Sequence, residues 1–226
     1  MPATLFPYPG VLPAFTSTGG ALFFADGHFS SVELQAMERD GLVRWLYTDS
    51  YVRWDIEPDP VCRALAAAHA LPARLRGKIM LGRFTAAWIY GCAPAPRKLQ
   101  LLVDHRSRTT ALPPFSAAVL HEVQLASEDG MDIAGIAVTT PLRTAADLAR
   151  HGPEEEAVQA LLAISANPVL RCPLAEIRCA VEDGPRQPGK SGALRRVDLA
   201  IEQARRDHVA AAEPPDQTRR REPVVR

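Results

Sequence analysis

One stretch of sequence decides the fold: Thr139-Thr140-Pro141-Leu142-Arg143-Thr144-Ala145-Ala146-Asp147-Leu148-Ala149-Arg150. Thr140 can accept a hydrogen bond from an unpaired backbone N–H at a helix start, and Pro141 suits the first helical position. Small and apolar residues then recur at helical spacing. The stretch therefore predicts a helix with one face of small residues.

The residues before this helix predict a short strand. Ile136-Ala137-Val138 is partly β-branched and follows Gly135, so it would lead the chain into the helix cap. Within the helix, Arg143 and Asp147 lie four residues apart and can form an ion pair, which contributes only about 0.3–0.5 kcal/mol when exposed. By itself, this element indicates structure rather than chemistry.

Length and composition indicate a folded protein. The chain has 226 residues, of which 47% are hydrophobic and 23% charged, so disorder throughout is excluded and one or two domains are expected. It begins without a basic residue or an apolar run, and no later segment approaches the roughly 20 apolar residues of a membrane span. We expect a cytoplasmic protein.

The cysteines and histidines form no pattern typical of a metal site. The four cysteines have no C-x-x-C spacing, and the six histidines have no H-x-x-x-H or H-E-x-x-H spacing. We expect unpaired core thiols, no metal ion and no cofactor. A metal site could then form only from ligands that lie on loops distant in sequence.

A net charge of zero hides an alternation along the chain. Residues 1–57 carry three arginines against seven acids, a net charge of −4. Residues 60–121 carry nine basic residues against one acid, a net charge of +8, and residues 122–182 carry four against ten, a net charge of −6. The basic block predicts an anion-facing surface, unless it pairs with the acidic block that follows.

The first 57 residues resemble part of a DNA-binding module. Proline and glycine are dense in residues 1–20, which predicts an irregular lead-in. A capped helix is predicted over residues 32–41 after Ser30 or Ser31, and a β-hairpin over residues 42–54. A helix followed at once by a hairpin is the back half of a winged helix.

In a winged helix, the helix enters the DNA major groove and the hairpin contacts the backbone. The candidate DNA-contacting residues are Ser31, Glu33, Gln35, Arg39, Arg44 and Arg53. The segment is net acidic, however, and no preceding helices are evident among the prolines and glycines. The alternative is a degenerate winged helix used for packing or dimerisation.

A second domain is predicted to begin at Pro58-Asp59-Pro60 with a helix over residues 61–71. Four cations follow, and they alternate with apolar residues in a way that predicts one buried and one cationic face. These candidate partner-binding or phosphate-binding residues are Arg74, Arg76, Lys78 and Arg83. A short helix over residues 85–90 should end at Gly91 and bury Trp88.

Strands are predicted over residues 98–103 and 117–123, and with residues 136–138 they suggest a sheet of at least three strands. Asp104-His105-Arg106 resembles a catalytic trio, but adjacent residues point to different sides and no nucleophile is tied to them, so a solvated loop is expected. Further helices are predicted over residues 154–164, 174–181 and 194–209, before a disordered tail over residues 210–226.

Residues 184–191 fit the phosphate-binding pattern G-x-x-x-x-G-K-S. That chemistry needs a strand feeding the loop and a later aspartate on a strand, whereas the residues before Gly184 predict a helix. Only 35 residues follow, which is too few for the rest of a nucleotide-binding fold. The segment is therefore interpreted as a connector between helices.

Two stretches together resemble the actinobacterial AbiEi-like antitoxins of type IV toxin–antitoxin systems. The first is the strand and helix around Val-Thr-Thr-Pro-Leu-Arg-Thr-Ala-x-Asp-Leu-Ala-Arg, which ends at Arg150. The second is Leu81-Gly82-Arg83-Phe84-Thr85-Ala86-Ala87-Trp88-Ile89-Tyr90-Gly91, where the family has Gly-Arg-x-x-Ala-Ala-x-x-x-Gly. The resemblance covers about residues 61–165.

The predicted architecture is α/β: a degenerate winged helix (residues 1–57), an AbiEi-like domain (58–182), and a connector, charged helix and tail (183–226). The resemblance implies a non-catalytic antitoxin that counters a nucleotidyltransferase-type toxin and can also repress its operon by binding DNA. The alternatives are a plain transcriptional regulator, a degenerate nuclease-family enzyme, or a nucleotide-binding enzyme that uses Lys190 and Ser191.

Overall fold

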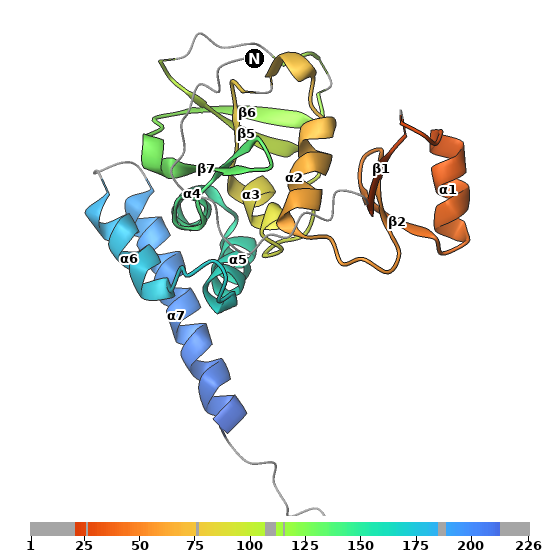
Figure 1. Cartoon of the computed structure of the whole chain (residues 1–226). Coiled ribbons are helices and arrows are strands. Elements are labelled where there is room, and N and C mark those ends of the chain that lie inside the picture. Colours follow the sequence, from red (N-terminus) through yellow and green to blue (C-terminus); the bar gives the residue numbers. More distant parts are fainter. Residues whose placement is uncertain are drawn as a thin grey trace, which may run out of the picture.

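A computed structural model describes residues 21–25, 27–75, 77–106, 112–114, 116–184 and 189–212. Figure 1 shows a small N-terminal lobe on one side, a mixed sheet with helices beside it, and a group of C-terminal helices from which the last one projects. Strands and helices alternate along the chain, and the strands form two sheets, so the predicted α/β class is confirmed.

The small lobe consists of one helix and a three-stranded antiparallel sheet. In chain order its elements are β1 (Leu22–Phe24), α1 (Ser31–Arg39), β2 (Val43–Tyr47) and β3 (Ser50–Arg53), and the strand order is β1-β3-β2. Ser30 caps α1, and the side chain of Glu33 bonds back to the backbone of Ser30. The predicted helix and hairpin are confirmed; within the described residues, α1 is the only helix of the lobe.

The two faces of this small sheet pack against different partners. Leu34 of α1 forms a cluster with Val43 and Tyr51 on one face. On the other face, Tyr47 belongs to the main core and its ring lies 5.1 Å from that of Trp88. The lobe is thus packed onto the rest of the chain, and the predicted burial of Trp88 is confirmed.

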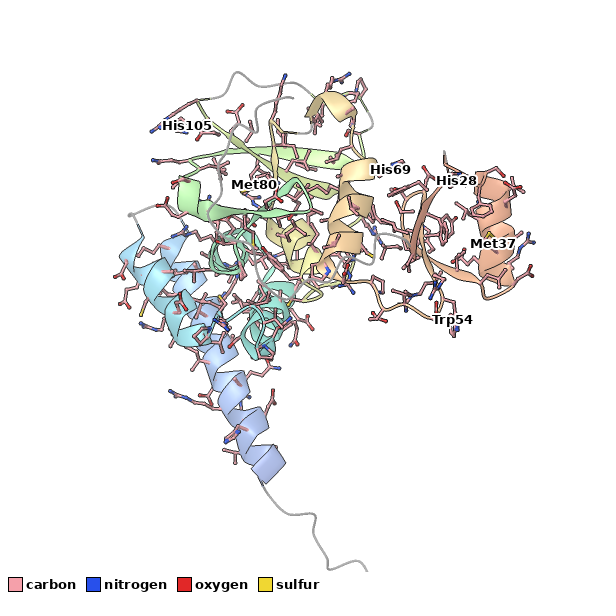
Figure 2. All side chains as sticks on the ribbon, viewed as in Figure 1. His28, Met37, Trp54, His69, Met80 and His105 are labelled. Carbon is pink, nitrogen blue, oxygen red and sulfur yellow. The ribbon has the colours of Figure 1, made fainter. Side chains whose placement is uncertain are left out.

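Helix α2 (Pro60–His69) forms the junction with the lobe. Asp59 caps it, Pro60 is its first residue, and it ends two residues before the predicted limit at residue 71. His69 stacks on Phe24 of the lobe with ring centroids 4.1 Å apart. Figure 2 shows His69 at this junction and Trp54 at the outer edge of the lobe.

The basic segment after α2 has one buried and one exposed side, as predicted, but it is not a single helix or strand. It contains a 3-10 turn, η2 (Ala73–Leu75), and the two-residue strand β4 (Met80–Leu81). Leu75 and Ile79 are buried, whereas Arg74 and Lys78 are exposed. Arg76 lies outside the described residues.

The larger sheet has the strand order β6-β5-β4-β8-β7. Its other strands are β5 (Leu99–Asp104), β6 (Ala118–Val123), β7 (Gly130–Ile133) and β8 (Ile136–Thr139). Strand β5 is parallel to β6, and β4 is parallel to β8; β4 with β5 and β7 with β8 are antiparallel. The three predicted strands are confirmed, and β4 and β7 complete the sheet.

Alternate residues of the sheet enter different clusters, because successive side chains on a strand point to opposite faces. Leu81 and Leu101 belong to the main core with the helices. Met80 and Leu102 belong to a smaller cluster with Leu125. The sheet is therefore buried on both faces at its centre.

Five helices complete the fold: α3 (Arg83–Ile89), α4 (Pro141–His151), α5 (Glu154–Ala166), α6 (Leu174–Asp183) and α7 (Lys190–Ala212). Helix α4 has the predicted cap on Thr140 and Pro141 as its first residue. Helix α3 begins two residues earlier than predicted. No helix in the described part of the chain is long and apolar enough to cross a membrane.

Three predictions need correction. Helix α7 continues to Ala212, so residues 210–212 are helical rather than part of a tail; residues 213–226, like the lead-in, lie outside the described residues. Asp104 is a buried strand end whose carboxylate accepts the backbone N–H of Arg106, not a loop residue. None of the four cysteines, all among the described residues, forms a disulfide, but only three are buried, since Cys179 is exposed.

Candidate functional site

The two motifs that carry the family resemblance pack against each other. The hydroxyl of Tyr90, at the end of α3, donates a hydrogen bond to the backbone carbonyl of Thr139, just before the α4 cap. The hydroxyls of Thr139 and Thr144 lie 2.7 Å apart, and both residues are fully buried. These contacts fix the start of α4 relative to α3.

The glycines and alanines of the motif at residues 81–91 are explained by close packing and by backbone conformation. A Cβ atom on Gly82 would lie 2.6 Å from Cδ1 of the buried Leu102, so any side chain there would force Leu102 to shift. Gly91 has φ of +76°, a left-handed conformation that ends α3 and favours glycine. Ala86 and Ala87 are fully buried. The motif therefore positions a tightly packed helix.

Arg83, between Gly82 and the rest of α3, has an unusual environment. Its φ is +52°, a strained conformation for a residue with a side chain. Its Nη1 lies 3.2 Å from the ring nitrogens of His121, and its buried Nε has no hydrogen-bond partner among the described residues. Burial lowers the pKa of the guanidinium, the direction expected for a cation removed from water.

Arg143 is the centre of a largely buried ion network. Its guanidinium lies 3.0 Å from Asp147 and 2.5 Å from Asp129, and it also donates to the backbone carbonyl of Gln124. The side chains of Arg143 and Asp147 are only 17% and 5% exposed. The predicted ion pair forms, but it is largely buried, so the small energy of an exposed pair does not apply to it. The network ties α4 to the loop after β6.

These groups line a polar pocket of about 540 Å³. The wall from α4 consists of residues one or two turns apart on one helix face, Arg143, Asp147, Arg150 and His151. The opposite wall comes from β6 and the loop that follows it, and Arg83 completes the lining. The remaining lining residues are Glu122, Val123, Gln124, Ala126 and Asp129.

The two histidines beside Arg83 favour the neutral form. Burial lowers the pKa of His121, and the positive charge of Arg83 lowers it further. The pKa of His151 is lowered by the same two causes in the same order. Asp147 opposes both shifts. The permanent guanidinium charges of the pocket therefore lie beside imidazoles that favour the neutral form.

The candidate DNA-contacting residues all lie in the small lobe, but several are engaged within the chain. Glu33 caps its own helix. Arg44 bonds to Glu57 at 2.8 Å, and Arg53 bonds to Asp55 at 2.5 Å. Ser31 begins α1, Gln35 is exposed on it, and Arg39 bonds weakly to the carbonyl of Gln35.

The four cations of the basic cluster do not lie in one environment. Arg74 and Lys78 are exposed, and their side chains have no partner among the described residues. Arg83 lies in the polar pocket instead. The position of Arg76, between the first two in sequence, is outside the described residues.

The phosphate-loop pattern at residues 184–191 has the wrong context for a nucleotide site. Helix α6 precedes it rather than a strand, and Lys190 begins α7. The Lys190 ammonium donates to the backbone carbonyls of Glu182 and Gly184. Residues 185–188 lie outside the described residues. The flanking helices agree with the predicted connector.

Comparisons with known proteins give little further information. No family model and no curated protein matches the chain. A crystal structure of the Rv2827c protein from Mycobacterium tuberculosis aligns with 87% of this chain and 78% of its own at 14% identity, with a TM-score of 0.40. Such a similarity is too low to support an argument about fold or function.

The polar pocket was not predicted from the sequence, although Arg83 and the Arg143–Asp147 pair were. Arg143, Asp147, Arg150 and His151 are spaced along one face of α4, a pattern that was visible in the sequence. Their partners come from the loop after β6, which no local pattern connects to α4. Among the described residues, no group of histidine, cysteine, aspartate and glutamate could hold a metal ion.

Proposed function

We propose that this protein is a cytoplasmic, non-catalytic antitoxin that counters a nucleotidyltransferase-type toxin. The observation that carries the proposal is the direct packing of its two family-like motifs, joined by the hydrogen bond from Tyr90 to Thr139. Both motifs act as structural elements in this arrangement, as expected for a protein that presents a fixed surface to another macromolecule.

The surface that we assign to the partner is the exposed basic segment around Arg74 and Lys78. Both cations have no partner among the described residues, while Leu75 and Ile79 anchor the segment in the core. Such cations attract an acidic protein surface or DNA phosphates without reorganising the fold. Arg83 is not included, because it lies in the polar pocket.

Charge reversal tests this assignment. The variant Arg74→Glu/Arg76→Glu/Lys78→Glu should fold normally but lose rescue of growth when co-expressed with the toxin encoded beside it. The control Arg205→Glu/Arg206→Glu reverses two exposed cations on α7 and should retain rescue. Equal rescue by both variants would remove the basic segment from the mechanism.

A second candidate function is repression of the operon through the small lobe. It is supported by the position of α1 on the outer face of the lobe (Figure 1). Gln35 and Arg39 of this helix are exposed. Gln35→Ala/Arg39→Ala should weaken operator affinity without reducing growth rescue. Unchanged operator affinity would instead favour the packing or dimerisation role for the lobe.

A further inference from the structure

Two guanidinium groups of the polar pocket form no ion pair with a carboxylate among the described residues. Arg143 is balanced by Asp129 and Asp147. Arg83 and Arg150, in contrast, have no ion pair within 4 Å in the described part of the chain. The carboxylate left on the pocket wall, Glu122, is exposed and has interactions of its own.

Arg83 is held in place at a cost in stability. Its backbone is strained, its guanidinium is half-buried, and its Nε is both buried and without a partner among the described residues. Leaving a charged donor unsatisfied in a partly dehydrated site is unfavourable. Such a combination of strain and unsatisfied charge is typical of binding sites, where a ligand supplies the missing partner.

Arg150 is placed to share a ligand with Arg83. It lies on α4 and lines the same pocket, next to His151, with its guanidinium against the backbone of Gly184. His121, in contact with Arg83, can donate through a ring N–H while it stays neutral. The volume of about 540 Å³ lies within the range of small-ligand pockets.

We infer that this pocket binds a phosphate group, with Arg83 and Arg150 as its cationic ligands and His121 and His151 as additional hydrogen-bond donors. Guanidinium groups match phosphate oxygens with two parallel hydrogen bonds, which satisfies the free Nε of Arg83. This binding site is independent of the proposed antitoxin function, which we assign to the exposed basic segment.

Titration calorimetry on the full chain tests the inference. The probes are inorganic phosphate, a nucleoside 5′-monophosphate, and one oligonucleotide with and without a 5′-phosphate. We expect saturable binding of at least one phosphorylated probe, and no binding of the unphosphorylated oligonucleotide at the same site. Preference for the 5′-phosphorylated oligonucleotide would identify a nucleic-acid end as the source, and preference for the mononucleotide a free metabolite.

Variants place the binding in the pocket. Arg83→Gln and Arg150→Gln should each weaken binding roughly tenfold or more, because each removes a charge-assisted contact. Arg178→Gln, which removes an exposed arginine of α6 outside the pocket, should leave binding unchanged. Binding that persists in both pocket variants would overturn the inference.

A second measurement uses only the unmodified protein, so it does not depend on whether a variant folds. NMR titration of the imidazole resonances should show that phosphate raises the pKa of His121 and His151, because a bound anion stabilises their charged forms. The absence of binding by every phosphorylated probe, or unmoved imidazole resonances on binding, would also overturn the inference.

Discussion

The Tyr90 hydroxyl donates a hydrogen bond to the backbone carbonyl of Thr139 and thereby joins the end of α3 to the start of α4. Both groups are buried, and Thr144 also bonds to the same carbonyl at 3.2 Å. Burial raises the pKa of Tyr90, so the hydroxyl remains a donor across the accessible pH range. We regard this bond as the central link between the two family-like motifs.

Removing this bond should destabilise the fold without abolishing it. Tyr90→Phe should lower the free energy of unfolding by about 1 kcal/mol, the usual net contribution of one hydrogen bond. The loss should not be larger, because the Thr139 carbonyl still accepts a hydrogen bond from Thr144. Chemical denaturation measures the change. The control Tyr47→Phe, in the same core cluster, removes a hydroxyl that has no bond among the described residues and should cost less. Equal losses would contradict the role given to Tyr90.

Gly82 should not tolerate a side chain. Gly82→Ala places a Cβ 2.6 Å from Cδ1 of Leu102, so we expect a loss of about 1–3 kcal/mol from overpacking. Gly192→Ala is the control: its Cβ would meet only Arg196, at 3.5 Å, inside α7, where alanine should stabilise the helix. A neutral Gly82→Ala in denaturation experiments would show that Leu102 can move aside.

The ion network of Arg143 should contribute strongly to stability because it is mostly buried. Arg143→Met leaves the carboxylates of Asp129 and Asp147 close together without their cation, and should cost about 3 kcal/mol. Arg178→Met breaks the exposed pairs of α6 and should cost far less. Thermal denaturation of both variants compares the two networks; similar shifts in Tm would mean that burial does not matter here.

His151, which lines the pocket, and His121, which contacts Arg83, predict a dependence of stability on pH. Both histidines have lowered pKa values in the folded protein. As pH falls, they therefore become protonated first in the unfolded chain, near the usual histidine pKa of about 6.5. The neutral histidines therefore contribute fully to the free energy of unfolding above that pH. The contribution is lost as pH falls through the lowered pKa that these residues have in the folded protein. Between neutral and mildly acidic pH, the free energy of unfolding of the double variant His121→Gln/His151→Gln should fall less steeply than that of the unmodified protein, as measured by chemical denaturation. An unchanged slope would contradict this assignment.

Local pattern was enough to predict most of the elements. The cap at Thr140, the proline after it and the spacing of small residues predicted α4 correctly, because these features act within one helix. The helix and hairpin of the small lobe were equally visible. The two-residue strand β4 was not predicted, since so short a strand is defined by its neighbours β5 and β8 rather than by its own sequence.

The candidate site was harder to predict, because its parts are distant in sequence. Arg83 was grouped with Arg74 on sequence proximity, yet it lies with Arg143 and Arg150 of α4. The Arg143–Asp147 pair was predicted, but its third member, Asp129, was not, because Asp129 comes from a loop 14 residues upstream. Charge patterns along a chain do not show which charges meet across the fold.

Growth rescue is the most direct test of the central proposal, that this protein counters a nucleotidyltransferase-type toxin. The intact chain should restore growth of cells that express a nucleotidyltransferase-type toxin encoded beside it. The purified protein should hydrolyse neither nucleotide nor nucleic acid. Continued growth arrest in cells that contain the folded protein would contradict the account.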